Sequence, residues 1–399
     1  MKKIKISSIL TIALITPQLL SAAGIWLYEG ATPEMGTAGA GRGALSNSAS
    51  TSLYNPAGMT RLKKSQIMVG IQPMYVDSHF KGDATKLNGQ EESGGNGGNA
   101  GGWIPSGAIY YVYSYSDDLK FGISSASYFG LGLSFDDDWK GRNFVTSASM
   151  MTLAVSPTMA YKINDQFSIG LGANILYAKL NQTLRRRTNN EEFELDSTDT
   201  GYGYNLSLMY EPTKNTRFGL TYASKVDFEF KDVGLGDDAD MKMSMPQSIT
   251  LSGFHQLNNN WAILSSLGWQ EWSKFGKTDI VLNNQTVVYN RHFDNTWHVS
   301  LGTHYKYSQP LTLMAGIAYD SSPVKDKYRT IDMPLDRQIR YSIGGTYEFS
   351  KKTTMGLAYE LMDSGEAKVD QDGPLNSNLN GSFETNYVHI FNINVNYKF

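Results

Sequence analysis

The last part of the chain alternates between apolar and polar positions. In NYVHIFNINVNYKF, residues 386–399, one face carries Tyr387, His389, Phe391, Ile393, Val395, Tyr397 and Phe399, and the other is rich in asparagine. A period of two is that of a β-strand whose two faces meet different surroundings. The same period recurs in residues 167–177, 339–349 and 355–361. The pattern therefore predicts many strands, each with one apolar face.

About fourteen segments qualify as strands, separated by Gly, Ser, Thr and Asn. They span residues 65–79, 105–116, 119–131, 143–162, 166–184, 199–212, 216–230, 243–257, 260–273, 293–307, 311–321, 337–350, 353–364 and 385–399. Tight turns such as SDD, NDQ and PTKN follow the even-numbered segments, and longer polar loops such as RRRTNNEEFELDS follow the odd-numbered ones. Soluble sandwiches also alternate apolar and polar faces, but alternating short and long connections are typical of transmembrane β-barrels. We predict an all-β fold, an antiparallel barrel of about 14 strands.

Aromatic residues near the strand ends support a membrane location. Trp261 and Trp269, Trp297 and Tyr305, and Tyr341 and Tyr347 occupy such positions, where an aromatic girdle lies. The terminal Phe399, two residues after Tyr397, resembles the signal that the barrel assembly machinery reads, and it is equally an apolar end to the last strand. We expect a bacterial outer-membrane protein.

The first residues predict export. Lys2, Lys3 and Lys5 precede an apolar run, and Ser21-Ala22-Ala23 offers small residues for cleavage, which together indicate a signal peptide over residues 1–22. A membrane anchor is the alternative, although the run is short for a spanning helix. The chain has no cysteine, which excludes a thiol nucleophile and a cysteine metal site. The net charge of −3, without a basic stripe, disfavours nucleic acid as a partner.

The segment before the first strand is too irregular for a strand and rich in small residues. It reads GTAGAGRGALSNSASTSLYNPAGMTRL, with Asn55, Pro56, Ala57 and Gly58 near its end. A barrel of this size leaves a lumen that something must fill. The segment resembles the N-terminal hatch of the FadL family of outer-membrane long-chain fatty acid transporters, and Asn55-Pro56-Ala57 matches that family's NPA motif. We therefore expect a hatch over residues 23–64 inside a barrel over residues 65–399.

The resemblance implies passive uptake of hydrophobic compounds, most of all long-chain fatty acids, with lateral release into the membrane. It places Ile25, with Trp26 and Leu27 beside it, at the ligand. That role for Ile25 requires cleavage after Ala22, whereas the small-residue rule favours cleavage after Ala23. It also implies a kinked third strand, where Gly122, Gly130 and Gly132 are the candidates for a lateral opening. The alternative is that these glycines only relieve crowding of side chains inside the barrel. Asn47 and Ser48 stand where many relatives carry an acidic residue.

Charged side chains also fall on inward positions. By strand parity Arg340, His298, His304 and Lys306 face the lumen, where they meet either a ligand carboxylate or an ion-pair network that holds the hatch. Lys306 lies near a short turn, which favours a contact with the hatch. Arg185, Arg186 and Arg187 begin an outside loop, and lipopolysaccharide phosphate or plain solvent is their expected partner.

Catalysis and cofactors have no support in the sequence. The six histidines lack an HExxH spacing, and nothing places a nucleophile beside any of them, so we expect no enzyme, no metal and no cofactor. Two alternatives to fatty acid uptake stay open. One is uptake of aromatic hydrocarbons, as the TodX-like members of the family suggest, and the other is a surface adhesin or receptor. The family resemblance implies a monomer.

Overall fold

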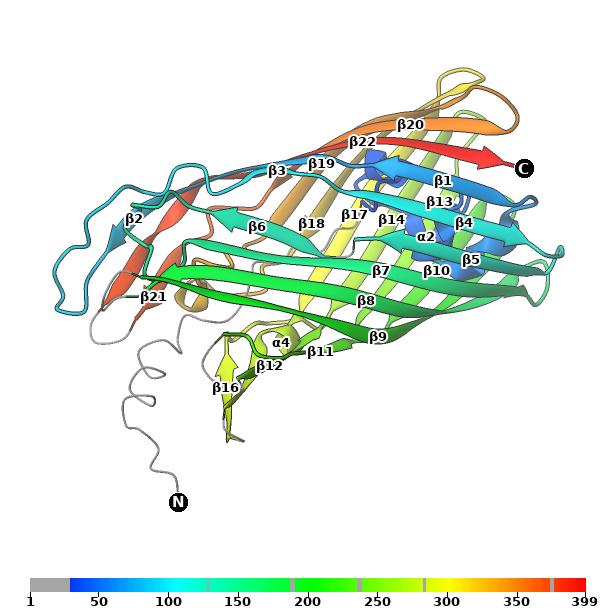
Figure 1. Cartoon of the computed structure of the whole chain (residues 1–399). Helices are drawn as coiled ribbons and strands as arrows, with labels where there is room; N and C mark the ends of the chain where they lie inside the picture. The colour runs from blue at the N-terminus through cyan, green and yellow to red at the C-terminus, as the bar shows by residue number, and fades with distance from the viewer. Residues whose placement is uncertain (1–28, 128, 187–190, 235–238, 283–284, 374–376) are drawn as a thin grey trace.

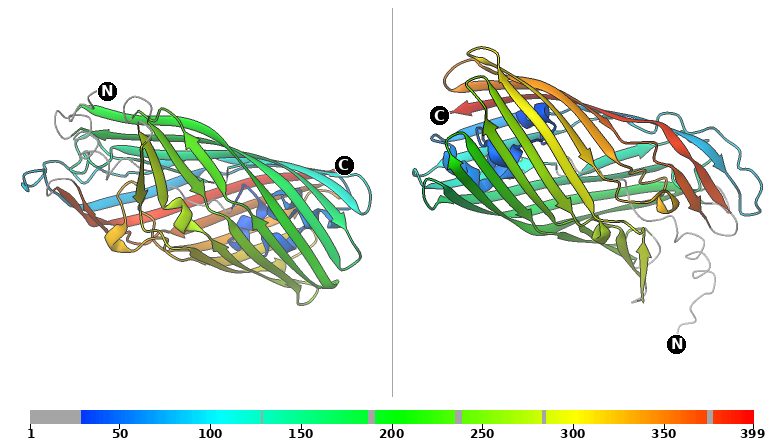
Figure 2. Two further views of the ribbon diagram at one scale, coloured as in Figure 1. Left: turned by 90° about the horizontal axis from the view of Figure 1, so that it is seen from below. Right: turned by 180° about the vertical axis from the view of Figure 1, so that it is seen from behind.

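The computed structural model describes residues 29–127, 129–186, 191–234, 239–282, 285–373 and 377–399. The predicted signal peptide and the ligand candidates Ile25, Trp26 and Leu27 lie outside these residues. Within these residues, fourteen strands pair antiparallel in a closed ring. Figures 1 and 2 show the barrel that they form. The order of pairing is β1-β4-β5-β7-β8-β9-β10-β13-β14-β17-β18-β19-β20-β22 and back to β1. The predicted fold class is confirmed.

The strands of this ring are of unequal length. They are β1(Gln66–Ile71), β4(Gly107–Ser114), β5(Leu119–Ala126), β7(Ser147–Lys162), β8(Phe167–Arg185), β9(Glu192–Thr213), β10(Thr216–Ala223), β13(Ser248–Gln256), β14(Trp261–Gln270), β17(Thr296–Lys306), β18(Leu311–Asp320), β19(Gln338–Glu348), β20(Thr353–Asp363) and β22(Asn378–Lys398). Four further strands extend the ring at the long-loop end, namely β2(Met74–Ala84), β3(Gly102–Ile104), β6(Gly130–Ser134) and β21(Val369–Asp372). The short turns lie at the same end as the C-terminus (Figure 1), so by the usual topology this end is periplasmic.

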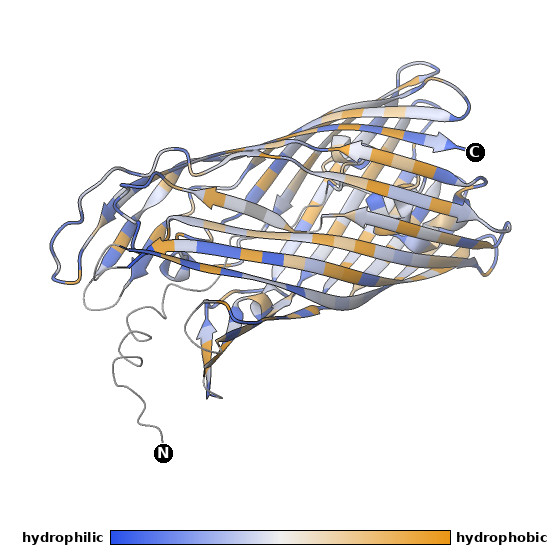
Figure 3. Ribbon diagram, viewed as in Figure 1, coloured by the Kyte–Doolittle hydropathy of each residue, from blue (hydrophilic) through white to orange (hydrophobic). Residues whose placement is uncertain are grey.

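The two faces of the wall differ as the alternation predicts. On β22, Asn392 and Asn394 are buried inside the ring, whereas Ile393 and Val395 point outward and are 42% and 43% exposed. On β17, Leu301 is 56% exposed. Bands of apolar residues alternate with polar ones along the strands in Figure 3. A soluble monomer rarely exposes so continuous an apolar surface, so the outer wall is suited to lipid.

A second sheet lies at the long-loop end and corrects two predicted strands. Segments 216–230 and 243–257 do not run continuously through the wall, because β11(Val226–Phe230) and β12(Asp240–Met245) leave it and pair with each other. β15(Lys277–Leu282) and β16(Gln285–Asn290) complete a four-stranded sheet beside the short helix α4(Trp272–Phe275). The reason is local: Val226, Phe228 and Phe230 continue the apolar alternation but bury their side chains instead of facing lipid.

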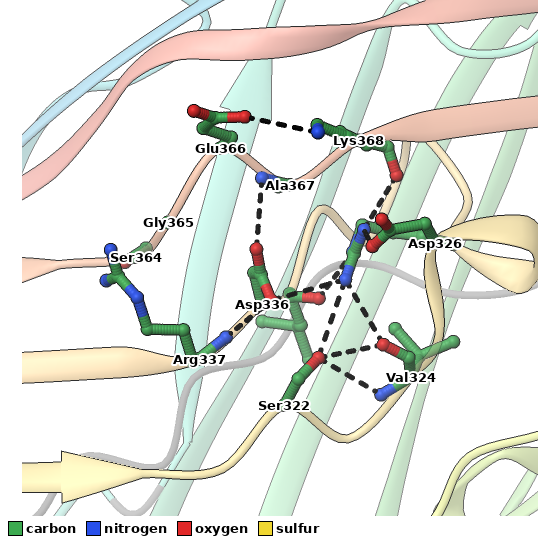
Figure 4. A network of polar contacts seen from close by, with 12 residues as sticks. Ser322, Val324, Asp326, Asp336, Arg337, Ser364, Gly365, Glu366, Ala367 and Lys368 are labelled. Carbon is green, nitrogen blue, oxygen red and sulfur yellow. Dashed lines mark hydrogen bonds and ion pairs between the residues drawn. The ribbon is translucent and has the colours of Figure 1, made fainter.

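Loops at this end are held by a buried arginine. Arg329 follows the short helix η3(Asp326–Tyr328) and is 1% exposed. Its guanidinium donates to the Leu335 carbonyl oxygen at 2.7 Å, to Asp326 Oδ1 at 2.6 Å and to the Lys368 carbonyl oxygen at 2.7 Å. Figure 4 shows how Asp326, Asp336, Val324 and Lys368 converge from two loops. The network therefore joins the β18–β19 loop to the segment between β20 and β21.

Residues 29–62, called the inner segment below, lie inside the periplasmic half of the ring. Their short helices are η1(Pro33–Thr37), α2(Arg42–Leu45), α3(Thr51–Tyr54) and η2(Pro56–Arg61). Nearly all of these residues are buried, and the helices contact strands around the wall, including β10, β13, β18, β19 and β7. In the described part of the chain, no helix has the length and apolarity to cross a membrane.

Candidate functional site

The inner segment is attached to the wall through the predicted motif. Asn55 is fully buried, and its Nδ2 group donates to the Gly43 carbonyl oxygen at 2.5 Å and to the Leu208 carbonyl oxygen at 3.3 Å. The Ala57 N–H group donates to Ser207 Oγ at 2.9 Å. One asparagine therefore joins two parts of the inner segment to strand β9, which an apolar residue of similar size cannot do.

The remaining motif residues shape the backbone. Pro56 is the first residue of η2, a position where a missing N–H group costs nothing. A Cβ atom on Gly58 would lie 2.0 Å from Ser46 Oγ, so only glycine fits there without a shift. At the end of η2, Arg61 forms an ion pair with Glu211 of β9. The motif thus fixes a tight path that ends at the wall.

Glycines on the wall face the inner segment. A Cβ atom at Gly219 on β10 would lie 2.0 Å from the Gly43 carbonyl oxygen, and one at Gly316 on β18 would lie 2.2 Å from the Thr37 carbonyl oxygen. The same close approach recurs at Gly70 and Gly170. Glycine in a strand often marks a place where another backbone comes close. Part of the high glycine content therefore serves the contact between the wall and the inner segment.

A buried charge cluster lies further toward the long-loop end. Arg340 on β19 is 1% exposed, and its Nε atom lies 3.3 Å from Glu29 Oε1 and 3.2 Å from Glu360 Oε1. Its Nη1 group also donates to Asp320. Glu29 belongs to the inner segment, whereas Glu360 and Asp320 belong to β20 and β18. Since buried carboxylates need an opposing charge, Arg340 joins the inner segment to the wall.

His298 completes this cluster. Its Nδ1 atom lies 2.9 Å from Asp320 Oδ1, and its Nε2 atom lies 3.2 Å from Ser300 Oγ. The structure therefore brings together two of the predicted ligand candidates, Arg340 and His298, on opposite oxygens of one carboxylate. Lys306 is not part of the cluster. It borders a separate cavity near the short turns together with His304.

Phe129, Trp272 and Phe275 form a buried aromatic group. The ring centroid of Phe129 lies 5.5 Å from that of Phe275 and 6.0 Å from that of Trp272. Trp272 Nε1 donates to Gln270 Oε1 at 2.7 Å, and Thr296, one inward position before His298, donates to the same oxygen at 3.4 Å. The protein thus buries both an apolar aromatic group and a guanidinium, the two features that an amphipathic carboxylic acid requires.

The third wall strand is interrupted beside this apolar region. β5 ends at Ala126 and β6 starts at Gly130, and Phe129 between them is fully buried. β5 has a partner strand on each side, whereas β6 pairs with β7 and β3 pairs with β2, so the described strands form no ladder between β6 and β3. Gly130 and Gly132 lie in β6. Gly122 lies in the fully paired part, where its Cβ position is 2.7 Å from Met59 of the inner segment.

The sequence prediction missed the acidic members of the cluster. The alternation places Tyr359 and Leu361 on the outer face. The inward position of Glu360 between them could therefore have been predicted from parity alone. Asp320 ends its strand, and Glu29 lies in a segment without period. Their meeting at Arg340 depends on neighbouring strands and on the path of the inner segment, which no local pattern specifies.

A closed antiparallel barrel with a lipid-facing apolar wall and a filled lumen defines a transmembrane β-barrel of the outer-membrane type. The family model described as outer membrane protein transport protein (OMPP1/FadL/TodX) matches residues 12–399. The chain belongs to this family, which confirms the resemblance seen in the sequence, and it is an outer-membrane protein.

Relatives of similar length support this membership. The chain is 26% identical to the long-chain fatty acid transport protein of Shigella flexneri, with 97% of each chain covered, and 27% identical to outer membrane protein P1 of Haemophilus influenzae, with 100% of each chain covered. Its fold matches the crystal structure of a Pseudomonas aeruginosa FadL homologue with a TM-score of 0.88 at 22% identity, over 94% of this chain and 100% of that one. The Pseudomonas putida toluene transporter TodX gives a TM-score of 0.68 at 18% identity, over 96% and 100%.

Proposed function

We propose that this protein carries long-chain fatty acids across the outer membrane by passive diffusion, with the inner segment as its hatch. The observation that carries the proposal is that the protein buries the Arg340 guanidinium together with an aromatic group of Phe129, Trp272 and Phe275. A hydrocarbon chain gains about 0.8 kcal/mol for each buried CH₂ group, and a carboxylate gains a charge-assisted hydrogen bond from arginine. An aromatic hydrocarbon makes no use of the guanidinium. No step requires catalysis.

Release of the ligand depends on an exit through the wall and on a movement of the hatch. In this proposal the apolar chain leaves between β6 and β3, where the described strands form no ladder, and Gly130 and Gly132 place no side chain on β6 there. A ligand can shift the equilibrium between two positions of the hatch only if it binds the protein more tightly in one of them. Glu29 supplies that difference, because a fatty acid carboxylate competes with the Glu29 carboxylate for Arg340. Binding therefore frees the inner segment from one of its contacts.

The substrate is tested by uptake of labelled oleate in cells that lack their own fatty acid transporter, with and without this protein. We expect the protein to restore uptake, and we expect excess toluene to leave that uptake intact. Uptake that toluene blocks would indicate a shared, less selective route. Correctly inserted protein that restores no uptake would contradict the proposal and favour aromatic hydrocarbons or a surface receptor.

Replacing Glu29 with glutamine should increase the affinity for fatty acid. The neutral amide competes less well for Arg340, so the ligand no longer works against a bound carboxylate, and we expect the Kd to fall roughly three- to tenfold, or about 1 kcal/mol. Titration of the purified protein with a fluorescent long-chain fatty acid measures this. Glu29→Asp, which keeps the charge, is the matched control. Unchanged or weaker binding in Glu29→Gln would contradict competition at Arg340.

A further inference from the structure

A polar cavity opens among the short turns, on the opposite side of the inner segment from the aromatic residues. Its volume is about 490 Å³. Five strand ends contribute to it, from β10, β13, β14, β17 and β18, together with the end of α2 in the inner segment. Most of its lining is carboxamide, cationic or imidazole: Asn47, Asn215, Asn258, Asn259, Asn260, Gln256, Arg217, Lys306 and His304.

The charged side chains of this cavity are of one sign. Arg217 and Lys306 line it together with the His304 ring, and among the described residues no aspartate or glutamate does. The nearby Glu211 already forms an ion pair with Arg61. Within the described residues, neither Arg217 nor Lys306 forms an ion pair, and the His304 Nε2 atom is buried without a hydrogen-bond partner. Such a cavity attracts an anion and offers donors to it.

Arg217 is built into this position. It is 7% exposed, and its guanidinium carbon lies 3.7 Å from the centre of the Phe254 ring. Nε donates to the Ala44 carbonyl oxygen at 2.6 Å and Nη2 donates to the Leu45 carbonyl oxygen at 2.9 Å. The described residues leave Nη1 without a hydrogen bond. The stacked, fixed guanidinium therefore keeps donors for a ligand while it holds the end of α2.

We propose that this cavity is an oxyanion site open to the periplasm, with Arg217, His304 and Lys306 as its donors. The ligand class is a carboxylate or phosphate group, because the planar guanidinium of arginine presents N–H donors that fit the oxygens of either group. The carboxamides around it supply neutral hydrogen bonds. Since Arg217 also binds the last carbonyls of α2, an anion in the cavity acts on the contact between β10 and the inner segment.

The site can be tested without any transport assay, so its outcome is separate from that of the proposed substrate. The full-length protein with ¹⁵N-labelled histidine is titrated at fixed pH and ionic strength with butyrate, with phosphate and with the neutral 1-butanol. The His304 ring signal is assigned by its loss in His304→Gln. We expect a saturable shift with at least one anion and none with 1-butanol. A response to butyrate alone indicates a carboxylate head group, and a response to phosphate alone indicates free phosphate.

Two variants make the test specific. Lys306→Met removes an exposed cation that does not hold the inner segment. This change should raise the Kd of the anion at least threefold. Lys352→Met removes an exposed cation from another short turn at the same end of the barrel and should leave the affinity unchanged. An absent shift, or an affinity that Lys306→Met does not change, would show that the cavity is only a solvent-filled vestibule and would overturn the proposal.

Discussion

Replacing Gly219 with valine is expected to displace the inner segment from the wall. The new Cβ atom would lie 2.0 Å from the Gly43 carbonyl oxygen and 2.6 Å from Asn55 Nδ2, and neither group can move without breaking the contact that holds the motif. Overpacking of this kind costs about 1–3 kcal/mol. Because Asn55 is the point where the motif meets β9, the inner segment should detach rather than adjust, and oleate uptake should fall.

The absence of cysteine from the chain allows a direct measurement. Ser48→Cys is a near-isosteric probe in the inner segment, where Ser48 is buried. We expect a membrane-impermeant maleimide, added to purified protein, to label this cysteine at least tenfold faster in the Gly219→Val background, since about 1.4 kcal/mol is a factor of ten. Gly253→Val on the neighbouring strand is the control, because its Cβ position is 3.1 Å from Ser265 Oγ and away from the inner segment. Equal labelling in a folded Gly219→Val barrel would contradict the role given to this glycine.

Replacing Arg340 with methionine should cause the largest loss of stability. The change leaves Glu29, Asp320 and Glu360 together in a buried site without the guanidinium that contacts all three. Removing one partner of a buried ion pair typically costs 3–5 kcal/mol. We expect a decrease of about that size in the free energy of unfolding, measured by urea titration of the protein in phospholipid vesicles.

Two further variants separate buried charge from general damage. Arg337→Met removes an arginine whose side chain is 36% exposed and pairs with Asp363, and it should cost less than about 1 kcal/mol. Adding Glu360→Gln to Arg340→Met should recover part of the loss, because one buried charge is then removed. If Arg337→Met and Arg340→Met were equally destabilising, the cluster would not be the stabilising element that its geometry indicates.

The alternation along the strands predicted the wall because it is a local property. Each strand has one face toward lipid and one toward the lumen, so residues such as Ile393 and Asn394 could be assigned to their sides without knowing any partner strand. The lengths of the connections then gave the topology. The prediction failed at 216–230 and 243–257, where apolar alternation continues past the wall. A face that packs on another sheet has the same period as a face that meets lipid.

The candidate site was predictable only in part. Arg340 and His298 could be placed inward by parity, and Asn55 could be recognised as part of a motif, because both signals are carried by a few neighbouring residues. The sequence could not predict that Lys306 lies apart from Arg340 and His298. All three residues face inward, and only their heights along different strands distinguish them. Glu29 was missed because its contact with Arg340 joins residues more than three hundred positions apart.

By itself, the sequence determined an exported all-β chain with an alternating wall and a small-residue segment before it. These properties follow from residue chemistry over a few positions, so they do not depend on contacts between distant parts of the chain. Only the tertiary structure decided which wall glycines touch the inner segment, which carboxylates share Arg340, and which cations line the periplasmic cavity. Those contacts depend on strand register and on the path of one segment through the lumen, and the closed ring fixes both at once.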